Sequence, residues 1–163
     1  MKVLITGAQG QVGRGLLASA PAGIVTVGLT RAQLDVGDAD AVQRMVQAQT
    51  PAVIINAAAY TAVDRAETEV DAARRVNGQG PRHLARAAAV CGARLVHIST
   101  DFVFDGLAGV PYAPDAPTAP WGVYGLTKLE GEQAVRELLP EDSVVLRTAW
   151  VYAPRGHNFL RTM

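Results

Sequence analysis

Residues 6–13 read Thr6-Gly7-Ala8-Gln9-Gly10-Gln11-Val12-Gly13, and this stretch indicates the architecture of the whole chain. It follows the apolar run 3–6, which predicts a buried strand, and it opens segment 11–19, where apolar residues recur at helical spacing. Glycine permits a tight turn, and the N-terminus of a helix attracts phosphate. The stretch therefore predicts a cradle for a dinucleotide pyrophosphate; the alternative is a glycine-rich turn that binds nothing. The residues predicted to form the cradle are Gly7, Gly10, Gln11, Val12 and Gly13.

Short apolar runs and amphipathic segments alternate along the rest of the chain. Further strands are predicted at 24–29, 52–56, 95–99 and 144–148, and further helices at 39–49, 69–76, 81–90 and 121–138. Four prolines within 106–120 exclude a helix there and predict an ordered loop or lid. This order predicts one α/β domain over 1–163, a parallel sheet with helices on both faces, whose ligands bind beyond the carboxyl ends of the strands.

Composition narrows the class of protein. The chain is 49% hydrophobic and 18% charged with a net charge of +0, and it has no basic cluster, so nucleic acid is not an expected partner. No apolar run approaches the roughly 20 residues that span a bilayer, and the start shows no signal-peptide pattern. The lone Cys91 excludes a disulfide framework and fits a cytoplasmic setting. The scattered His83, His97 and His157 show no metal-ligand spacing, so no structural metal site is predicted.

The residues at the end of the second predicted strand are expected to determine whether the chain binds NAD or NADP. An acidic side chain there would bind the ribose 2′-hydroxyl and repel a 2′-phosphate. This chain instead has Thr30 and Arg31, which can accept a phosphate, while Asp35 precedes Val36 further on and could flank the adenine. The sequence therefore favours NADP(H) and leaves NAD(H) open, because Arg31 could also be a solvated charge and Asp35 a turn residue.

A run of small residues, Asn56-Ala57-Ala58-Ala59-Tyr60-Thr61, follows the third predicted strand. Small side chains let a cofactor pass close to the backbone, although tight packing beneath a helix explains any single alanine nearly as well. The cofactor contacts predicted from this region and from the next strand are Ala58, Ala59, Tyr60 and Ile98.

Tyr124 and Lys128 lie one helical turn apart and therefore project from one face of a helix. The ammonium is expected to lower the tyrosine pKa from about 10 and so tune the phenol as a proton donor to a carbonyl, and Lys128 is also expected to hold the nicotinamide ribose. Thr100, at a strand end, is predicted to hydrogen-bond the same carbonyl; Ser99 would face the opposite way. The pattern indicates hydride transfer to or from a carbonyl.

Two further side chains are candidate substrate contacts. Asp101 either binds a polar group of the substrate or caps a turn. Trp150 either flanks a sugar ring or packs in the core or at a domain interface.

These residues together resemble those of the extended short-chain dehydrogenases/reductases, and more closely those of the dTDP-4-dehydrorhamnose reductase family. The similarity runs over essentially all 163 residues. The stretches that carry it are 7–13, 56–64 (Asn-Ala-Ala-Ala-Tyr-Thr-Ala-Val-Asp), 99–106 (Ser-Thr-Asp-Phe-Val-Phe-Asp-Gly), 123–125 with Lys128, and 147–152 (Arg-Thr-Ala-Trp-Val-Tyr).

The resemblance implies a doubly wound Rossmann domain that reduces the C4 ketone of dTDP-4-dehydro-6-deoxy-L-mannose, a nucleotide sugar of dTDP-rhamnose biosynthesis. It implies Tyr124 as proton donor, Lys128 as its partner and ribose ligand, and Thr100 as second carbonyl contact, with Asp101 and Trp150 facing the substrate. Some family members are homodimers and use magnesium, so both are possible here by resemblance alone. Family chains continue into a C-terminal substrate-binding lobe that is absent from this chain.

Two rival functions stay open. A noncatalytic NADP-binding regulatory subunit would not need the proton-transfer set Thr100, Tyr124 and Lys128. Another enzyme of the same superfamily, such as a sugar-nucleotide epimerase, would retain NAD, and a dehydratase would be expected to add an acidic pair where only Asp101 is present.

Overall fold

The structure, a computed structural model, describes residues 1–153, 158 and 163. Its parallel strands form one sheet in the order β2-β1-β3-β4-β5, which confirms the predicted α/β architecture. They are β1 (Lys2–Thr6), β2 (Val25–Leu29), β3 (Val53–Asn56), β4 (Arg94–Thr100) and β5 (Ser143–Thr148). The chain order reverses at β1, because β2 pairs with one side of it and β3 with the other. Such a reversal opens a crevice at the carboxyl ends of the strands.

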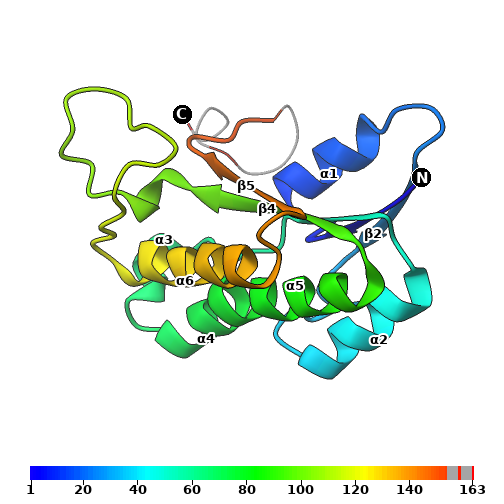
Figure 1. Cartoon of the computed structure of the whole chain (residues 1–163). Coiled ribbons are helices and arrows are strands. Elements are labelled where there is room, and N and C mark those ends of the chain that lie inside the picture. Colours follow the sequence, from blue (N-terminus) through cyan, green and yellow to red (C-terminus); the bar gives the residue numbers. More distant parts are fainter. Residues whose placement is uncertain (154–157, 159–162) are drawn as a thin grey trace.

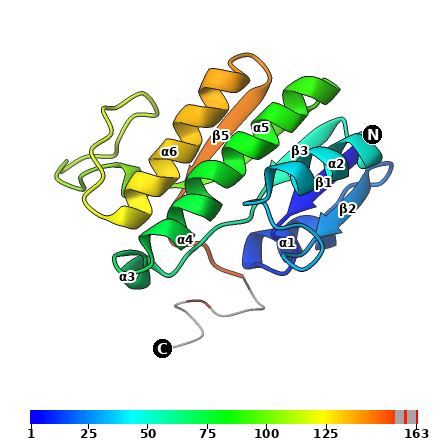
Figure 2. The ribbon, with the colours of Figure 1, turned by 90° about the horizontal axis from the view of Figure 1, so that it is seen from below.

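Helices cover both faces of the sheet (Figures 1 and 2). The four longer ones are α1 (Gln11–Ala18), α2 (Ala39–Gln49), α5 (Gly80–Cys91) and α6 (Val123–Leu138). Helix α1 lies on one face, whereas α2, α5 and α6 lie side by side on the other. The main core fills the space between that layer and the sheet, where Leu4, Ile54 and Leu95 of the strands meet Leu84 and Val135 of the helices. Among the described residues, no helix is long and apolar enough to cross a membrane.

The α1 face is less fully covered near β5. Val145 packs against the main core, so strand alternation turns Val144 and Leu146 toward the opposite face. There they remain 52% and 45% exposed.

Residues 63–91 differ from the two separate helices that the sequence predicts. A short helix α3 (Val63–Ala66) precedes α4 (Val70–Arg74), and a π-helix η1 (Arg75–Gln79) joins α4 directly to α5. The π turn falls where Pro81 has no N–H to donate to the carbonyl of Asn77. Helix α6 packs directly on this carbonyl, because a Cβ added to Gly131 would lie 2.2 Å from the oxygen. The other predicted elements agree with the structure to within two residues at each end.

The proline-rich segment forms the predicted ordered loop between η2 (Asp101–Val103) and α6. The rings of Phe104 and Tyr112 stack with centroids 4.3 Å apart, and the Tyr112 hydroxyl donates to Asp105. The guanidinium of Arg147 lies 4.8 Å from the centroid of Phe104. These contacts hold the loop against the carboxyl end of β5.

Candidate active site

A cleft of about 730 Å³ lies at the carboxyl ends of β1, β3 and β4, where the strand order reverses. The glycine turn after β1 forms one part of its wall, and the start of α6 forms another. Of the residues predicted to bind the cofactor, the following line the cleft: Gly7, Gly10, Gln11, Val12, Arg31, Asp35, Val36, Ala58, Ala59, Tyr60, Ile98, Tyr124 and Lys128. Gly13 and Thr30 do not line it.

The glycine turn is pressed against the chain that follows β3. Gly7 has a φ of +68°, and a Cβ there would lie 2.6 Å from the backbone of Ala57 and Ala58. Gly13 has a packing role, since its Cβ would lie 2.3 Å from the carbonyl oxygen of Gly7. No side chain caps the N-terminus of α1 at Gly10, so the first-turn N–H groups suit an anionic ligand.

At the end of the cleft near β2, the Asp35 carboxylate accepts hydrogen bonds from two groups of the protein. One carboxylate oxygen accepts from the N–H of Gly37 at 2.9 Å, and the other accepts from the Arg75 guanidinium at 2.8 Å. Burial raises the pKa of Asp35, but these two donors and the charge of Arg31 outweigh it and lower that pKa below its usual value. Arg31 has no ion-pair partner within the described part of the chain. Asp35 is therefore a carboxylate whose charge is paired with Arg75, next to the positive charge of Arg31.

Two buried asparagines fix the cleft wall after β3. The Asn56 side-chain oxygen accepts from Ala58 N–H at 3.2 Å, and its amide nitrogen donates to Nδ1 of His97 at 3.1 Å. The π-helix directs Asn77 to the same wall, where its side chain pairs with both the N–H and the carbonyl of Tyr60, at 2.9 and 3.1 Å. The wall therefore rests on buried polar contacts that keep the backbone of residues 57–60 in place.

Helix α6 brings Tyr124 beside Thr100 by an unusually close approach. A Cβ on Gly125 would lie 2.3 Å from the carbonyl oxygen of Phe102, so only glycine lets α6 contact η2 in this way. The Tyr124 ring then packs edge-on against Phe102, with centroids 5.5 Å apart and an interplanar angle of 82°. Further along α6, the Lys128 side chain is buried and donates to the carbonyl of Ile98 at 2.6 Å.

The prediction that Lys128 lowers the pKa of Tyr124 is wrong. Burial raises the pKa of Tyr124, the negative charge of Asp101 adds to the rise, and a hydrogen bond with Thr100 opposes it only in part. The ammonium of Lys128 turns to the Ile98 carbonyl. Burial also lowers the pKa of Lys128 to about 8, with Glu132 opposing the fall. At neutral pH the phenol therefore holds its proton and the lysine is mostly charged.

The two hydroxyls at the end of β4 point in different directions, as strand alternation predicts. The Thr100 hydroxyl donates to Asp101 at 3.0 Å and lies beside Tyr124, whereas Ser99 donates to Glu132 at 2.6 Å. Asp101 itself lines a second cleft of about 470 Å³, next to β5. Trp150, with a φ of +50° and 67% exposure, lines neither cleft. The structure thus places Thr100 beside both Tyr124 and Asp101 and leaves Trp150 apart from them. Thr100 itself lines neither cleft, whereas Ser99 lines the first one.

Three buried polar residues were missed as functional candidates by reasoning from the sequence. Asn77 lies between the predicted helices 69–76 and 81–90, in a stretch to which the sequence assigned no element and no role. His97 was recognised only as part of a strand, and Glu132 has the spacing of an ordinary helical surface charge. Among the described residues, no group of three or more potential ligands could hold a metal ion; His157 lies outside them.

Comparisons with known proteins agree with this geometry. At 48% identity over 161 residues, a dTDP-4-dehydrorhamnose reductase of Streptomyces griseus matches 98% of this chain, and the match covers 53% of that relative. A crystal structure of a dTDP-4-dehydrorhamnose reductase from Clostridium acetobutylicum superposes with a TM-score of 0.96 at 42% identity, covering 99% of this chain and 57% of that one. A reductase of the same name from Bacillus anthracis, in complex with NADP, gives a TM-score of 0.96 at 40% identity with the same coverage.

The chain spans about half the length of the curated relatives that it matches. The sequence profile of one family, described as the RmlD substrate binding domain, matches residues 1–163. The chain therefore belongs to the RmlD substrate binding domain family.

Proposed function

We propose that this chain provides the NADP(H)-binding and proton-transfer part of a dTDP-4-dehydrorhamnose reductase. The observation that carries the proposal is the arrangement of one cleft, which begins at an uncapped helix N-terminus beside a glycine turn and ends at Tyr124 and Lys128. Relatives that bear this name match nearly the whole chain, and one of their structures contains NADP.

The cleft fits a dinucleotide at two places, the pyrophosphate and the adenosine end. The close approach of Gly7 to Ala57 leaves room for no side chain in the turn, and first-turn N–H groups of α1 suit the pyrophosphate. At the adenosine end, the Arg75 guanidinium neutralises Asp35, so a 2′-phosphate can approach Arg31. Together these favour NADP(H) over NAD(H).

When bound, the nicotinamide supplies the hydride for the C4 ketone of dTDP-4-dehydro-6-deoxy-L-mannose. Tyr124 gives its phenolic proton to the ketone oxygen, and its raised pKa keeps that proton in place at neutral pH until negative charge develops on the oxygen. Thr100, beside Tyr124, turns its hydroxyl proton from Asp101 to the same oxygen and donates a second hydrogen bond to it. Lys128 binds the nicotinamide ribose with its ammonium, which already lies at the cleft wall beside Ile98.

Isothermal titration calorimetry with NADPH and NADH tests the cofactor site directly. We expect the chain to bind NADPH more tightly than NADH, and we expect Lys128→Ala to weaken NADPH binding by about tenfold, the value of one charged hydrogen bond. Lys2→Ala is the matched control, because Lys2 donates to the carbonyl of Gln49 outside the cleft. Failure of the folded chain to bind either dinucleotide would overturn the proposal and favour a noncatalytic role.

A second measurement tests the chemistry. The chain is mixed with NADPH and dTDP-4-dehydro-6-deoxy-L-mannose, and the loss of NADPH absorbance is followed. Tyr124→Phe should abolish any such loss while NADPH binding is retained, since the phenylalanine keeps the ring against Phe102 and removes only the proton donor. Equal rates with and without the hydroxyl would refute the role of Tyr124.

A further inference from the structure

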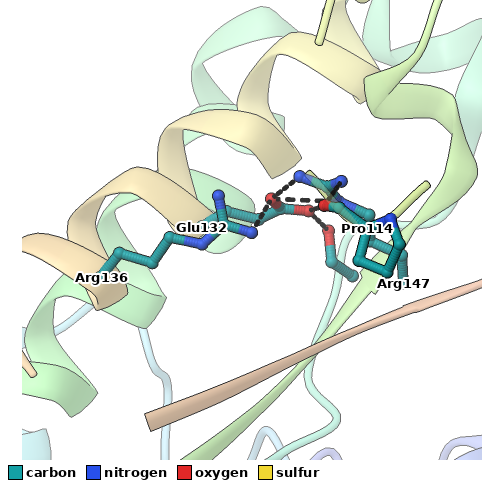
Figure 3. Close-up of polar contacts among 5 residues, drawn as sticks. Pro114, Glu132, Arg136 and Arg147 are labelled. Atoms are coloured by element: carbon teal, nitrogen blue, oxygen red, sulfur yellow. Dashed lines mark hydrogen bonds and ion pairs between the residues drawn. The ribbon is translucent and has the colours of Figure 1, made fainter. Parts of the chain in front are cut away.

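Helix α6 carries a buried carboxylate one turn beyond Lys128. The Glu132 side chain is 0% exposed, and Figure 3 shows Arg147 and Arg136 converging on it. Its Oε2 accepts from Arg147 Nη2 at 2.7 Å and lies 3.3 Å from an Arg136 guanidinium nitrogen. Its Oε1 accepts from Arg147 Nε at 3.0 Å and from the Ser99 hydroxyl at 2.6 Å. A buried carboxylate is tolerated only when its oxygens are satisfied in this way.

Glu132 and Lys128 bind consecutive residues of β4. The Lys128 ammonium donates to the carbonyl of Ile98, and Glu132 accepts from the hydroxyl of the next residue, Ser99, with both distances 2.6 Å. From the neighbouring strand, Arg147 holds the far side of the carboxylate with a side chain that is only 13% exposed. One helix is thus fastened to one strand at two adjacent points. Sliding α6 along β4 would break both contacts and would move Tyr124, which lies on the same helix.

The charges around Lys128 come from several elements. From β4, His97 faces it, and burial together with the charge of Lys128 holds the pKa of that imidazole well below its usual value, so the imidazole is neutral. Asp101 of η2 acts on Tyr124, and Arg147 of β5 is paired with Glu132. Glu132 is therefore the charge that offsets the burial of Lys128, whose pKa is about 8.

We propose that Glu132 is a positioning residue for the Tyr124–Lys128 pair: it fastens their helix to β4 through Ser99 and Arg147, and it places a buried carboxylate one helical turn from Lys128. The inference deepens the proposed function, on which it rests, because Lys128 is there the ligand of the cofactor ribose. It also reaches the proline-rich loop, since Arg147 Nη1 donates to the carbonyl of Pro114 at 3.1 Å (Figure 3).

The chain contains only two lysines, Lys2 and Lys128, which permits a direct test. With ¹³C-labelled lysine, each side chain gives its own Cε signal in NMR spectra, and Lys2→Arg assigns them. A pH titration should show a midpoint for Lys128 at about 8. In Glu132→Gln we expect this midpoint to fall by about one pH unit, because an adjacent opposite charge is lost.

The direction in which the Lys128 midpoint moves distinguishes an effect of the Glu132 charge from a purely structural effect of the substitution. A variant that only loosens α6 would expose Lys128 to water and raise its midpoint toward about 10.4. Glu130→Gln is the matched control: it removes the same charge from the same helix, but Glu130 pairs with Arg74 and is not among the charges that act on Lys128. Its midpoint for Lys128 should equal that of the wild type.

An unchanged or raised midpoint in Glu132→Gln would overturn the inference. If that variant does not fold, because it leaves Arg147 buried without a partner, the double variant E132Q/R147M removes both charges and is titrated instead. Its Lys128 midpoint should still lie below that of the wild type, and equality would overturn the inference in the same way. The titration needs no cofactor, so its failure is distinct from failure of NADPH binding, which would overturn the proposed function.

Discussion

Replacing Gly7 with alanine should lower the free energy of unfolding by about 2–5 kcal/mol. Two costs add up. The φ of +68° at Gly7 places an alanine in the left-handed region, at about 1–2 kcal/mol. The new Cβ would also lie 2.6 Å from backbone atoms of Ala57 and Ala58, which cannot turn aside as a side chain can, and such overpacking costs about 1–3 kcal/mol.

Two other glycines separate these costs. Gly92 has a φ of +64° and nothing within 4 Å of an added Cβ, so Gly92→Ala should show the backbone cost alone, about 1–2 kcal/mol. Gly15 lies inside α1 with equally open surroundings, so Gly15→Ala should stabilise the protein by about 0.5–1 kcal/mol. Urea unfolding followed by circular dichroism measures all three. A cost for Gly7→Ala no larger than that for Gly92→Ala would refute the close contact between the glycine turn and residues 57–58.

Three further predictions concern α6, the buried histidine and the adenosine end. Gly125→Ala should lower the free energy of unfolding by about 1–3 kcal/mol in the same assay, because its Cβ would lie 2.3 Å from the Phe102 carbonyl oxygen. A decrease below about 0.5 kcal/mol, which is typical of a neutral surface substitution, would contradict that contact. His97 stays neutral in the fold, so below about pH 6.5 the unfolded chain binds a proton that the folded chain does not. The free energy of unfolding should therefore fall by about 1.4 kcal/mol for each unit by which the pH is lowered. His97→Asn should remove that part of the slope, and an identical pH dependence in the variant would count against a buried neutral imidazole. Arg75→Gln should reduce the preference for NADPH over NADH by about twofold to fivefold, because a partly exposed ion pair with Asp35 is worth about 1 kcal/mol or less. The preference is measured as the ratio of the two Kd values. An unchanged ratio would show that Arg75 does not contribute to cofactor specificity.

The sheet and the grouping of the site could be predicted because both depend on local patterns. Apolar runs such as 95–99 are long enough to be strands, and the carboxyl ends of parallel strands necessarily share one edge. That the hydroxyls of Ser99 and Thr100 point in different directions follows from the two-residue repeat of a strand, and the structure shows this. The role of Thr100 as the carbonyl contact stays a prediction.

The features that were not predicted depend on contacts between distant elements. Glu132 has a helical spacing that fits a solvated face, and only the arrival of Arg147 from β5 makes it a buried ion pair. The spacing of Tyr124 and Lys128 is right for a shared helix face, but it does not say that the lysine will turn to the Ile98 carbonyl. The π-helix was missed because Asn77, Gly78 and Gly80 interrupt the apolar pattern, so the sequence predicts a break between two helices where the structure has a continuous helical turn.

Arg147 contacts a main-chain oxygen of Pro114, and this limits which substitutions the contact tolerates. Every amino acid offers the same carbonyl, so residue 114 can be substituted without loss of the acceptor, provided that the path of the loop is kept. Arg147 has no such freedom, because its guanidinium must reach this oxygen and Glu132 at once. Variation in the loop therefore leaves its attachment intact, and the two ends of this contact need not vary together among related sequences.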